Sequence, residues 1–437
     1  METKWPLSTL GEHIELSTGE AFKSAEFTTN PSLGTRLARG DNVKEGAFEW
    51  GEKSRYWPSL TKDLEKHLLK EDDILLGMDG SKVGKNWVRV RKSDLPCLLV
   101  QRVARLRAKQ SLDQIYLRYL IGNEYFRNYV EQIKTGSAIP HISGGQIKAY
   151  QIPLPPIAEQ KRIAGILGAL DDKIELNRKM NETLEQMAMA LFKSWFVDFD
   201  PVQAKAAGRQ PAGMDKATAD LFPDSFVETE IGDIPRGWTL TLFSEIADID
   251  KGLSYKGEGL ADEGGLPMIN LGCFTGRGIF NSERIKRYTG EYRERHLIKE
   301  GDLVIANTDM TQKRTIIGSP AIIPKLEGES KILFTHHTFV ARFKPGYEIW
   351  RQYVFFTLLK PEFREIAEGF STGTTVLALP RDGLSKYRFC LPDESLLEKF
   401  SIQISPILSA IEANNRQSRS LGATRDTLLP KLLAIAT

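Results

Sequence analysis

PPIAEQKRIAGILGALDDKIELNRKMNETLEQMAMALFKSWF, residues 155–196, is polar or charged at most positions, yet apolar side chains return every seven residues. The recurring positions are Ile163, Leu170, Asn177, Leu184 and Leu191. A weaker row falls three residues after each of them, at Ile166, Lys173, Met180, Met187 and Ser194. This spacing predicts a single helix with an apolar seam, and a rise of about 1.5 Å per residue makes the helix about 50–60 Å long.

A helix of that length needs a partner of similar length, and the same chain offers one. The seam recurs 237 residues later at Phe400, Ile407, Asn414, Leu421 and Leu428, with asparagine again at the centre. An exposed helical asparagine is the commoner case, and two independent surface helices are the alternative. Two matched rows with matched asparagines favour paired helices, in which the buried amides set the register.

Composition places the chain among folded proteins of ordinary charge. It has 437 residues, 41% of them hydrophobic, and a net charge of +2, so any contact with nucleic acid must come from local clusters of charge. Cys97, Cys273 and Cys390 are widely separated and lack the spacing of metal ligands. The chain has no apolar run of about 20 residues and no signal peptide in METKWPLSTLGEHIEL. We therefore expect a soluble cytoplasmic protein without membrane association.

The long helices belong to a larger internal repeat. Val103-Ala104-Arg105 matches Val340-Ala341-Arg342 at the same offset of 237, whereas Gly19 matches Gly252 at 233. Offsets that drift indicate loop insertions between retained elements. The predicted order is a globular domain at 1–154, a long helix at 155–199, a linker at 200–230 with one short helix, a second globular domain at 231–392 and a second long helix at 393–437. Pro406 is expected to start or kink that second helix.

Each globular half has signals for both strands and helices. Residues 73–76, 100–106, 302–305 and 338–343 are rich in β-branched and aliphatic side chains, which is typical of strands. Residues 116–134 and 353–368 have helical spacing and precede a glycine-bearing loop. The predicted fold class is therefore α+β, with two similar mixed domains separated by long helices.

The chain shows no recognisable catalytic motif. GxxxxGK[ST], a GxGxxG after a strand and the [DNS]PP[YF] tetrapeptide of amino-group methyltransferases are all missing from the sequence. His336 and His337 are adjacent, which would point their rings apart on a strand and favours a structural role. We therefore expect neither a catalytic residue nor a metal site.

Basic and polar loop residues are the more informative signal. Nine cations lie between residues 82 and 109, opposed only by Asp94: Lys82, Lys85, Arg89, Arg91, Lys92, Arg102, Arg105, Arg107 and Lys109. Strand alternation could present several of them to phosphates, and a solvated sheet face explains them equally well. The corresponding loop in the second half is NTDMTQKRT, residues 307–315, whose side chains can pair with base edges. A repeated framework with different loops is what two readers of two different short sequences would require.

Four motifs resemble the specificity subunits of type I restriction–modification enzymes: IPLPPIAEQKRI at 152–163, LFKSWFVDFDPV at 191–202, LFPDSF at 221–226 and IGDIPRGW at 231–238. The resemblance implies two target-recognition domains, each reading half of a bipartite double-stranded DNA target. It also implies that the long helices pack as an antiparallel coiled coil, which relates the two domains by a pseudo-two-fold axis and sets the spacer between the half-sites. The opening of the second helix, LPDESLLEKF, departs from the family pattern.

The resemblance also implies partners. Two methyltransferase subunits would bind the helices, with motor–nuclease subunits beyond them, and these partners would use S-adenosylmethionine, ATP and Mg²⁺ while this chain has no cofactor of its own. The residues that we expect to face DNA are Lys82, Lys85, Ser137, His141, Asn307, Lys313, Arg314, Thr374 and Thr375. Their division between base and phosphate contacts stays open.

Two other functions stay open at this point. The first is a single-chain DNA nuclease or methyltransferase with a diverged site, which activity of the purified chain alone would reveal. The second is a protein-binding scaffold, which failure of the assembled complex to bind duplex DNA would favour.

Overall fold

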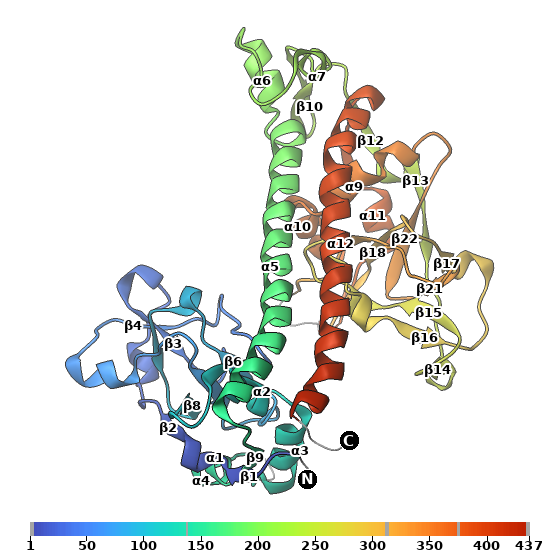
Figure 1. The fold of residues 1–437 in the computed structure, drawn as a ribbon. Coiled ribbons are helices and arrows are strands. Elements are labelled where there is room, and N and C mark those ends of the chain that lie inside the picture. Colours follow the sequence, from blue (N-terminus) through green and yellow to red (C-terminus); the bar gives the residue numbers. More distant parts are fainter. Residues whose placement is uncertain (1–3, 137–138, 311–313, 374–375, 434–437) are drawn as a thin grey trace. The chain divides into compact units, whose positions relative to one another are not determined.

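The computed structural model describes residues 4–136, 139–310, 314–373 and 376–433, and it divides into two compact units (Figure 1). Unit 1 comprises Met1–Arg178 with Asn415–Thr437, and unit 2 comprises Lys179–Asn414. Both units combine helices with mostly antiparallel sheets, which confirms the predicted α+β class.

Unit 1 is built on a four-stranded antiparallel sheet in the order β2-β8-β5-β6. A second sheet, β4-β3-β7, contains a parallel β3–β7 pair, and β1 pairs with β9. The elements are β1 (Leu7–Thr9), α1 (Leu10–His13), β2 (Ile14–Thr18), β3 (Thr35–Ala38), β4 (Tyr56–Trp57), β5 (Ile74–Gly77), β6 (Trp87–Arg89), β7 (Cys97–Leu99), β8 (Val103–Ala108), α2 (Gln114–Ile121), α3 (Glu124–Ile133), α4 (Gly144–Lys148) and β9 (Gln151–Pro153).

Unit 2 repeats this plan. Its sheet β13-β22-β18-β20 corresponds to β2-β8-β5-β6, and β12–β24 corresponds to β1–β9. A five-stranded sheet, β14-β16-β15-β21-β17, again contains one parallel pair, β15–β21. The elements are β12 (Thr239–Leu242), α8 (Phe243–Ile246), β13 (Ala247–Lys251), β14 (Leu260–Ala261), β15 (Leu266–Ile269), β16 (Lys286–Tyr288), β17 (Leu297–Ile298), β18 (Leu303–Ala306), β19 (Thr308–Asp309), β20 (Pro320–Ile322), β21 (Ile332–Phe334), β22 (Thr338–Phe343), α9 (Arg351–Leu358), α10 (Pro361–Phe370), β23 (Leu377–Ala378), α11 (Arg381–Ser385) and β24 (Arg388–Leu391).

The sheet register corrects one match of the internal repeat. Ile74 lies opposite Leu106 in unit 1, and Leu303 lies opposite Ala341 in unit 2, so β8 and β22 correspond at an offset of 235 instead of 237. The counterpart of Arg342 is therefore Arg107. A slip of two residues keeps side chains on the same face of a strand, which explains why the sequence pattern did not reveal it.

From α2 and α9 onward the offset of 237 holds. The Tyr116 hydroxyl on α2 donates to the Pro153 carbonyl at 3.2 Å, and the Tyr353 hydroxyl on α9 donates to the Cys390 carbonyl at 2.5 Å. Each bond ties a buried helix to the strand that precedes a long helix. The helices predicted at 116–134 and 353–368 are confirmed, although each is divided into two.

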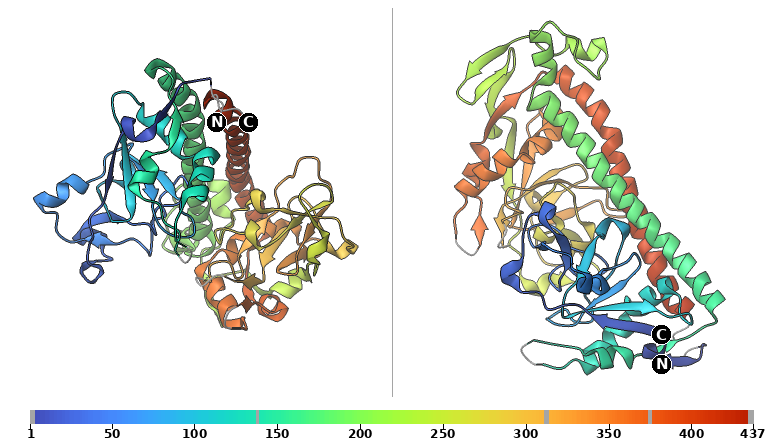
Figure 2. Two further views of the ribbon diagram at one scale, coloured as in Figure 1. Left: turned by 90° about the horizontal axis from the view of Figure 1, so that it is seen from below. Right: turned by 90° about the vertical axis from the view of Figure 1, so that its left-hand side faces the viewer.

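The long helices are α5 (Ile157–Phe196) and α12 (Glu394–Leu433), each of 40 residues. The helix α12 continues through Pro406, so the expectation that this proline starts the helix is wrong. Pro406 lies on the exposed side, as does Ile402 at 67% exposure, where water can satisfy the carbonyl that lacks an N–H partner. Within each unit a segment of α5 lies against a segment of α12 (Figure 2).

The predicted seam differs in its second row. Ile166, Met180 and Met187 are 37–53% exposed, so they do not form the contact. The buried row lies one residue further along, at Leu167, Asn181, Ala188 and Trp195. In the first row Ile163 and Asn177 are fully buried and Leu170, Leu184 and Leu191 are partly buried; in α12 Phe400 is buried and Ile407, Asn414, Leu421 and Leu428 are partly buried.

The segment predicted as a linker is a folded part of unit 2. It contains α6 (Asp200–Ala206), α7 (Lys216–Asp220) and the start of a hairpin of β10 (Phe226–Thr229) and β11 (Gly232–Pro235). Val202 and Phe222 are buried in the same core as Phe196 and Trp238. These apolar anchors hold a segment whose composition suggested flexibility.

Candidate nucleic-acid interface

Three segments meet at one end of the four-stranded sheet of unit 1, and we call them the loop cluster of unit 1. Ile142 N donates to Met78 O at 3.0 Å, and Met78 N donates to Arg102 O at 3.0 Å. Backbone bonds therefore join the loop after β5, the loop between α3 and α4 and the turn between β7 and β8. The described residues of these segments are 78–86, 134–136 with 139–142, and 100–102.

Unit 2 has the same backbone bonds at the corresponding positions, in what we call the loop cluster of unit 2. Leu379 N donates to Asn307 O at 2.8 Å, and Asn307 N donates to His337 O at 3.0 Å. In each unit a glycine allows the backbone of the loop cluster to approach a neighbouring helix closely. Gly84 and Gly318 have φ of +79° and +71°, and a Cβ on either would lie under 3.0 Å from a side chain of α3 or α10. The two clusters thus share one backbone framework.

The framework holds charged side chains in unit 1. Arg102 is 69% exposed, and its Nη1 lies 3.0 Å from Oδ2 of Asp79, whose side chain is 18% exposed. His141 is half exposed, and its Nδ1 contacts the other oxygen of the same carboxylate. Arg102 has a positive φ of 66°, which is uncommon for a residue other than glycine. The Asp79 carboxylate therefore contacts both the exposed guanidinium of Arg102 and the half-exposed imidazole of His141.

The corresponding side chains of unit 2 are neutral. His337 Nδ1 and the Thr308 hydroxyl are 3.2 Å apart, and Ala378 stands at the third position. Burial lowers the pKa of His337, and the neighbouring His336 and Lys251 lower it further. The rings of His336 and His337 are 3.8 Å apart, so the expectation that they point apart is wrong. The two residues lie in a turn between β21 and β22, where side chains do not alternate.

The residues expected to face DNA fall into three groups. Lys82, Lys85 and His141 lie in the loop cluster of unit 1, and Arg314 is exposed beside that of unit 2. Asn307 differs from the expectation that it faces DNA. Its side chain is 2% exposed, donates to His336 O and accepts from the Thr308 hydroxyl. Its amide supports the framework and is not available to a base. Ser137, Lys313, Thr374 and Thr375 lie outside the described residues.

The basic run at 82–109 is not a continuous phosphate-binding face. Arg89 pairs with Asp72 at 2.6 Å, Arg91 pairs with Glu175 at 2.9 Å and Arg107 pairs with Asp73 at 2.5 Å. Arg105 donates to the carbonyls of Lys66 and Leu68. These cations are used within unit 1, and their acidic partners lie too far away in the sequence to be found by local pattern.

Comparison with known proteins finds similarity to one family. Residues 2–186 match the family described as the type I restriction modification DNA specificity domain. The MjaIX specificity subunit of Methanocaldococcus jannaschii is 26% identical over 384 residues, which cover 85% of this chain and 79% of the relative. The HindI specificity subunit of Haemophilus influenzae is 26% identical over 367 residues, covering 74% and 77%. The chain is thus similar to type I specificity subunits over most of its length.

A solved structure shares the fold of this chain. The S subunit from M. genitalium superposes with a TM-score of 0.57 at 16% identity, over 100% of this chain and 98% of the other. Among the described residues, no helix is long and apolar enough to cross a membrane. In the same part of the chain, no group of three or more histidine, cysteine or acidic side chains is arranged to hold a metal ion.

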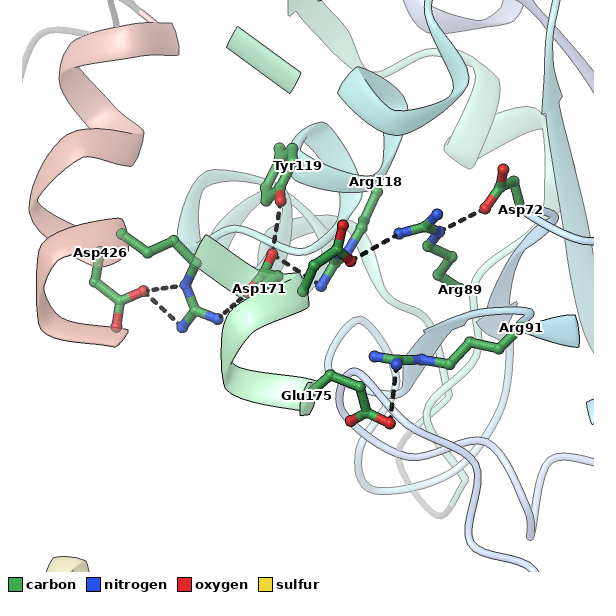
Figure 3. Close-up of polar contacts among 10 residues, drawn as sticks. Asp72, Arg89, Arg91, Arg118, Tyr119, Asp171, Glu175 and Asp426 are labelled. Carbon is green, nitrogen blue, oxygen red and sulfur yellow. Dashed lines mark hydrogen bonds and ion pairs between the residues drawn. The ribbon is translucent and has the colours of Figure 1, made fainter. Parts of the chain in front are cut away.

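In unit 1, a buried ion cluster joins the globular part to both long helices. The carboxylate of Asp171 on α5 accepts from the Tyr119 hydroxyl at 2.6 Å and from Arg425 on α12 at 2.8 Å, and Arg118 lies 2.9 Å away. Figure 3 shows Tyr119, Arg118 and Asp171 converging. Asp171 is 7% exposed, so these bonds replace the water that its charge has lost.

Asparagine amides at the seam connect the helices in each unit. Asn177 donates to Ser418 at 3.2 Å and to Gln417 at 2.9 Å in unit 1. Asn414 donates to Asn181 at 2.8 Å in unit 2. The offset of 237 relates Asn177 to Asn414 and Asn181 to Ser418, so the two pairs are repeats of one contact. The matched asparagines therefore both serve the helix pair, each through a different partner.

Proposed function

We propose that this chain is a type I specificity subunit and that it binds double-stranded DNA through its two loop clusters, each of which reads one half of a bipartite target. The observation that carries the proposal is one backbone framework with different side chains in the two units. Backbone that is repeated positions the reader, whereas side chains that differ change which base edges are recognised. A protein that read one sequence twice would have similar side chains at these positions.

The exposed cations beside the clusters support contact with phosphates. Lys82 and Arg314 are exposed and Lys85 is partly exposed, and we propose that they bind the DNA backbone. The residues of this group outside the described ranges, Ser137, Lys313, Thr374 and Thr375, are proposed to belong to the same surface because they stand at the tips of these loops in sequence. These contacts would supply affinity without sequence preference.

The long helices are proposed to set the spacer between half-sites and to bind two methyltransferase subunits, with motor–nuclease subunits beyond them. Support comes from the antiparallel contacts in each unit, where buried amides oppose one another at defined positions. S-adenosylmethionine, ATP and Mg²⁺ would act in those partners, and this chain would contribute no catalytic group.

Mapping of methylated adenines tests the proposal. The chain is co-expressed with its methyltransferase subunit, and modified adenines are sequenced genome-wide, with the methyltransferase alone as the control. We expect one motif of two short half-sites separated by unread bases, only when both proteins are present. A continuous motif, or the same motif without this chain, would contradict the proposal. Methylation or cleavage of DNA by the purified chain alone would instead show an enzyme.

A further inference from the structure

The loop cluster of unit 1 contains an arginine at a backbone position that suits glycine. Val103 N donates to Val100 O at 3.3 Å and closes a turn in which Arg102 is the third residue, with a φ of 66°. Glycine is favoured there, because a side chain adds strain of about 1–3 kcal/mol. Local folding therefore does not explain the arginine. Strained non-glycine residues cluster at functional sites, so the function of Arg102 is expected to lie in its side chain.

The Arg102 side chain is both exposed and oriented. It is 69% exposed, and its Nη1 is held 3.0 Å from Oδ2 of Asp79. One carboxylate contact uses only part of a guanidinium that has five N–H donors in a planar fork. The remaining donors keep the planar geometry that can match two acceptors at once.

The charges around Arg102 favour a base edge over a phosphate. Asp79 compensates the positive charge and would repel a phosphate placed at the same spot. A guanine edge offers the neutral acceptors O6 and N7, which an arginine binds with two parallel bonds. His141 contacts the same carboxylate through Nδ1, which leaves Nε2 for a neighbouring base or for water.

We infer that Arg102 reads a guanine in the half-site bound by unit 1, and that Asp79 positions its guanidinium. The inference rests on the proposed DNA-binding function and names the residue and the base. In unit 2 the same backbone position holds His337, whose imidazole contacts Thr308, so that position determines a base of the other half-site with neutral chemistry. The framework is common to both units, and the residue at this turn sets what each unit reads.

The test uses the complex of the full chain with its methyltransferase and the variant Arg102→Gly. Because glycine suits the turn, the variant should keep or raise the thermal midpoint of the subunit and should still assemble. We expect the preference for guanine at one position of one half-site to fall about 5- to 150-fold, the worth of one bidentate pair. The other half-site and the spacer should stay the same. Asp79→Asn should weaken the same preference to a smaller degree.

The matched control is Lys109→Gln, which removes one positive charge at the far end of the same strand, about 20 Å from Arg102. It should leave the motif unchanged. An unchanged motif for Arg102→Gly, or an even loss over all sites without a relaxed position, would overturn the assignment. The proposed function would survive that result if the wild-type complex still methylates a bipartite motif. A continuous wild-type motif would instead refute the proposed function itself.

Discussion

The Arg425 guanidinium of α12 donates to the Asp171 carboxylate of α5 over 2.8 Å, although 254 residues separate the two. Asp171 also accepts a hydrogen bond from the Tyr119 hydroxyl, so one buried carboxylate connects the globular part of unit 1 to two helices. The following residue, Asp172, is 75% exposed and lies 4.0 Å from Arg89. The chain thus provides a buried and an exposed acid side by side.

Asp171→Ala should destabilise unit 1 far more than Asp172→Ala. Removing the buried carboxylate leaves Arg118 without its counter-ion and leaves Arg425 with only the exposed Asp426, which costs about 3–5 kcal/mol. Loss of the exposed acid should cost under about 1 kcal/mol. Urea denaturation of both variants at neutral pH measures the difference. Equal shifts of the two midpoints would show that Asp171 is not the central contact.

Unit 2 has an apolar version of this cluster at the offset of 237. The counterparts in unit 2 lie in or against its core: Phe355 for Arg118, Phe356 for Tyr119, Leu408 for Asp171 and Ala188 for Arg425. Transferring all four apolar residues into unit 1 should be neutral or should stabilise it by about 1–4 kcal/mol, because no buried charge remains to be desolvated. Urea denaturation of this four-residue variant and the wild type measures the change in stability. A loss comparable to that of Asp171→Ala would mean that the two sites differ in shape.

Protonation of His296 should destabilise unit 2 at acid pH. This ring is 6% exposed, its Nδ1 accepts from Arg293 N at 3.2 Å, and its pKa is lowered by burial, then by Arg295 and Arg293, against a smaller effect of Asp250. A lowered folded pKa means that the unfolded chain binds the proton more tightly. The stabilising contribution is therefore complete above about pH 6.5 and is lost as the pH falls from there toward the folded pKa.

The variant His296→Gln isolates this contribution. Thermal midpoints of the wild type and the variant are measured between pH 8 and 5 in one buffer series. The wild type should lose more stability than the variant as the pH drops through the window below about 6.5. If the thermal midpoints of the two proteins fell in parallel with pH, His296 would not be a cause of the loss of stability at acid pH.

Much of this architecture is visible in the amino-acid pattern, and the misses have physical causes. Asn177 and Asn414 identify paired helices because amides at matched seam positions are rare without a partner. The second seam row was misplaced by one residue because helical repeats of 3.5 and 3.6 residues assign Ile166 and Leu167 to the seam almost equally well. Only packing distinguishes them, with Leu167 fully buried and Ile166 37% exposed.

The candidate site was harder to predict because its contacts are long-range. The basic run is compatible with a phosphate-binding face or a solvated sheet face in the sequence, yet Arg91 pairs with Glu175, 84 residues further along the chain. Asn307 has a side chain that suits DNA bases, yet the turn at His336 requires a donor for its buried carbonyl and uses that amide. Arg102 was noted only as one of nine cations, and its positive φ could not be known from the sequence.

Lys82→Gln should separate phosphate contact from base reading. The lysine is exposed in the loop cluster of unit 1 and is proposed to bind the DNA backbone. Its loss should lower affinity evenly for cognate and non-cognate duplexes, and the slope of log affinity against log salt should fall by about 1. Titration of labelled duplexes with the assembled complex at several salt concentrations gives both quantities. A changed preference for one base with an unchanged slope would place Lys82 at a base edge.

Lengthening both long helices together should change the spacer and nothing else. Seven residues are inserted between Asn177 and Asn181 in α5 and seven between Asn414 and Ser418 in α12, so that both amide pairs are kept. One heptad adds about 10 Å, which corresponds to about three base pairs of duplex. Methylation mapping should therefore return the same half-sites with a longer gap. Insertion into α5 alone is the control, and it should impair assembly because opposed seam residues no longer match. An active double insertion with an unchanged gap would show that the helix pair does not measure the target.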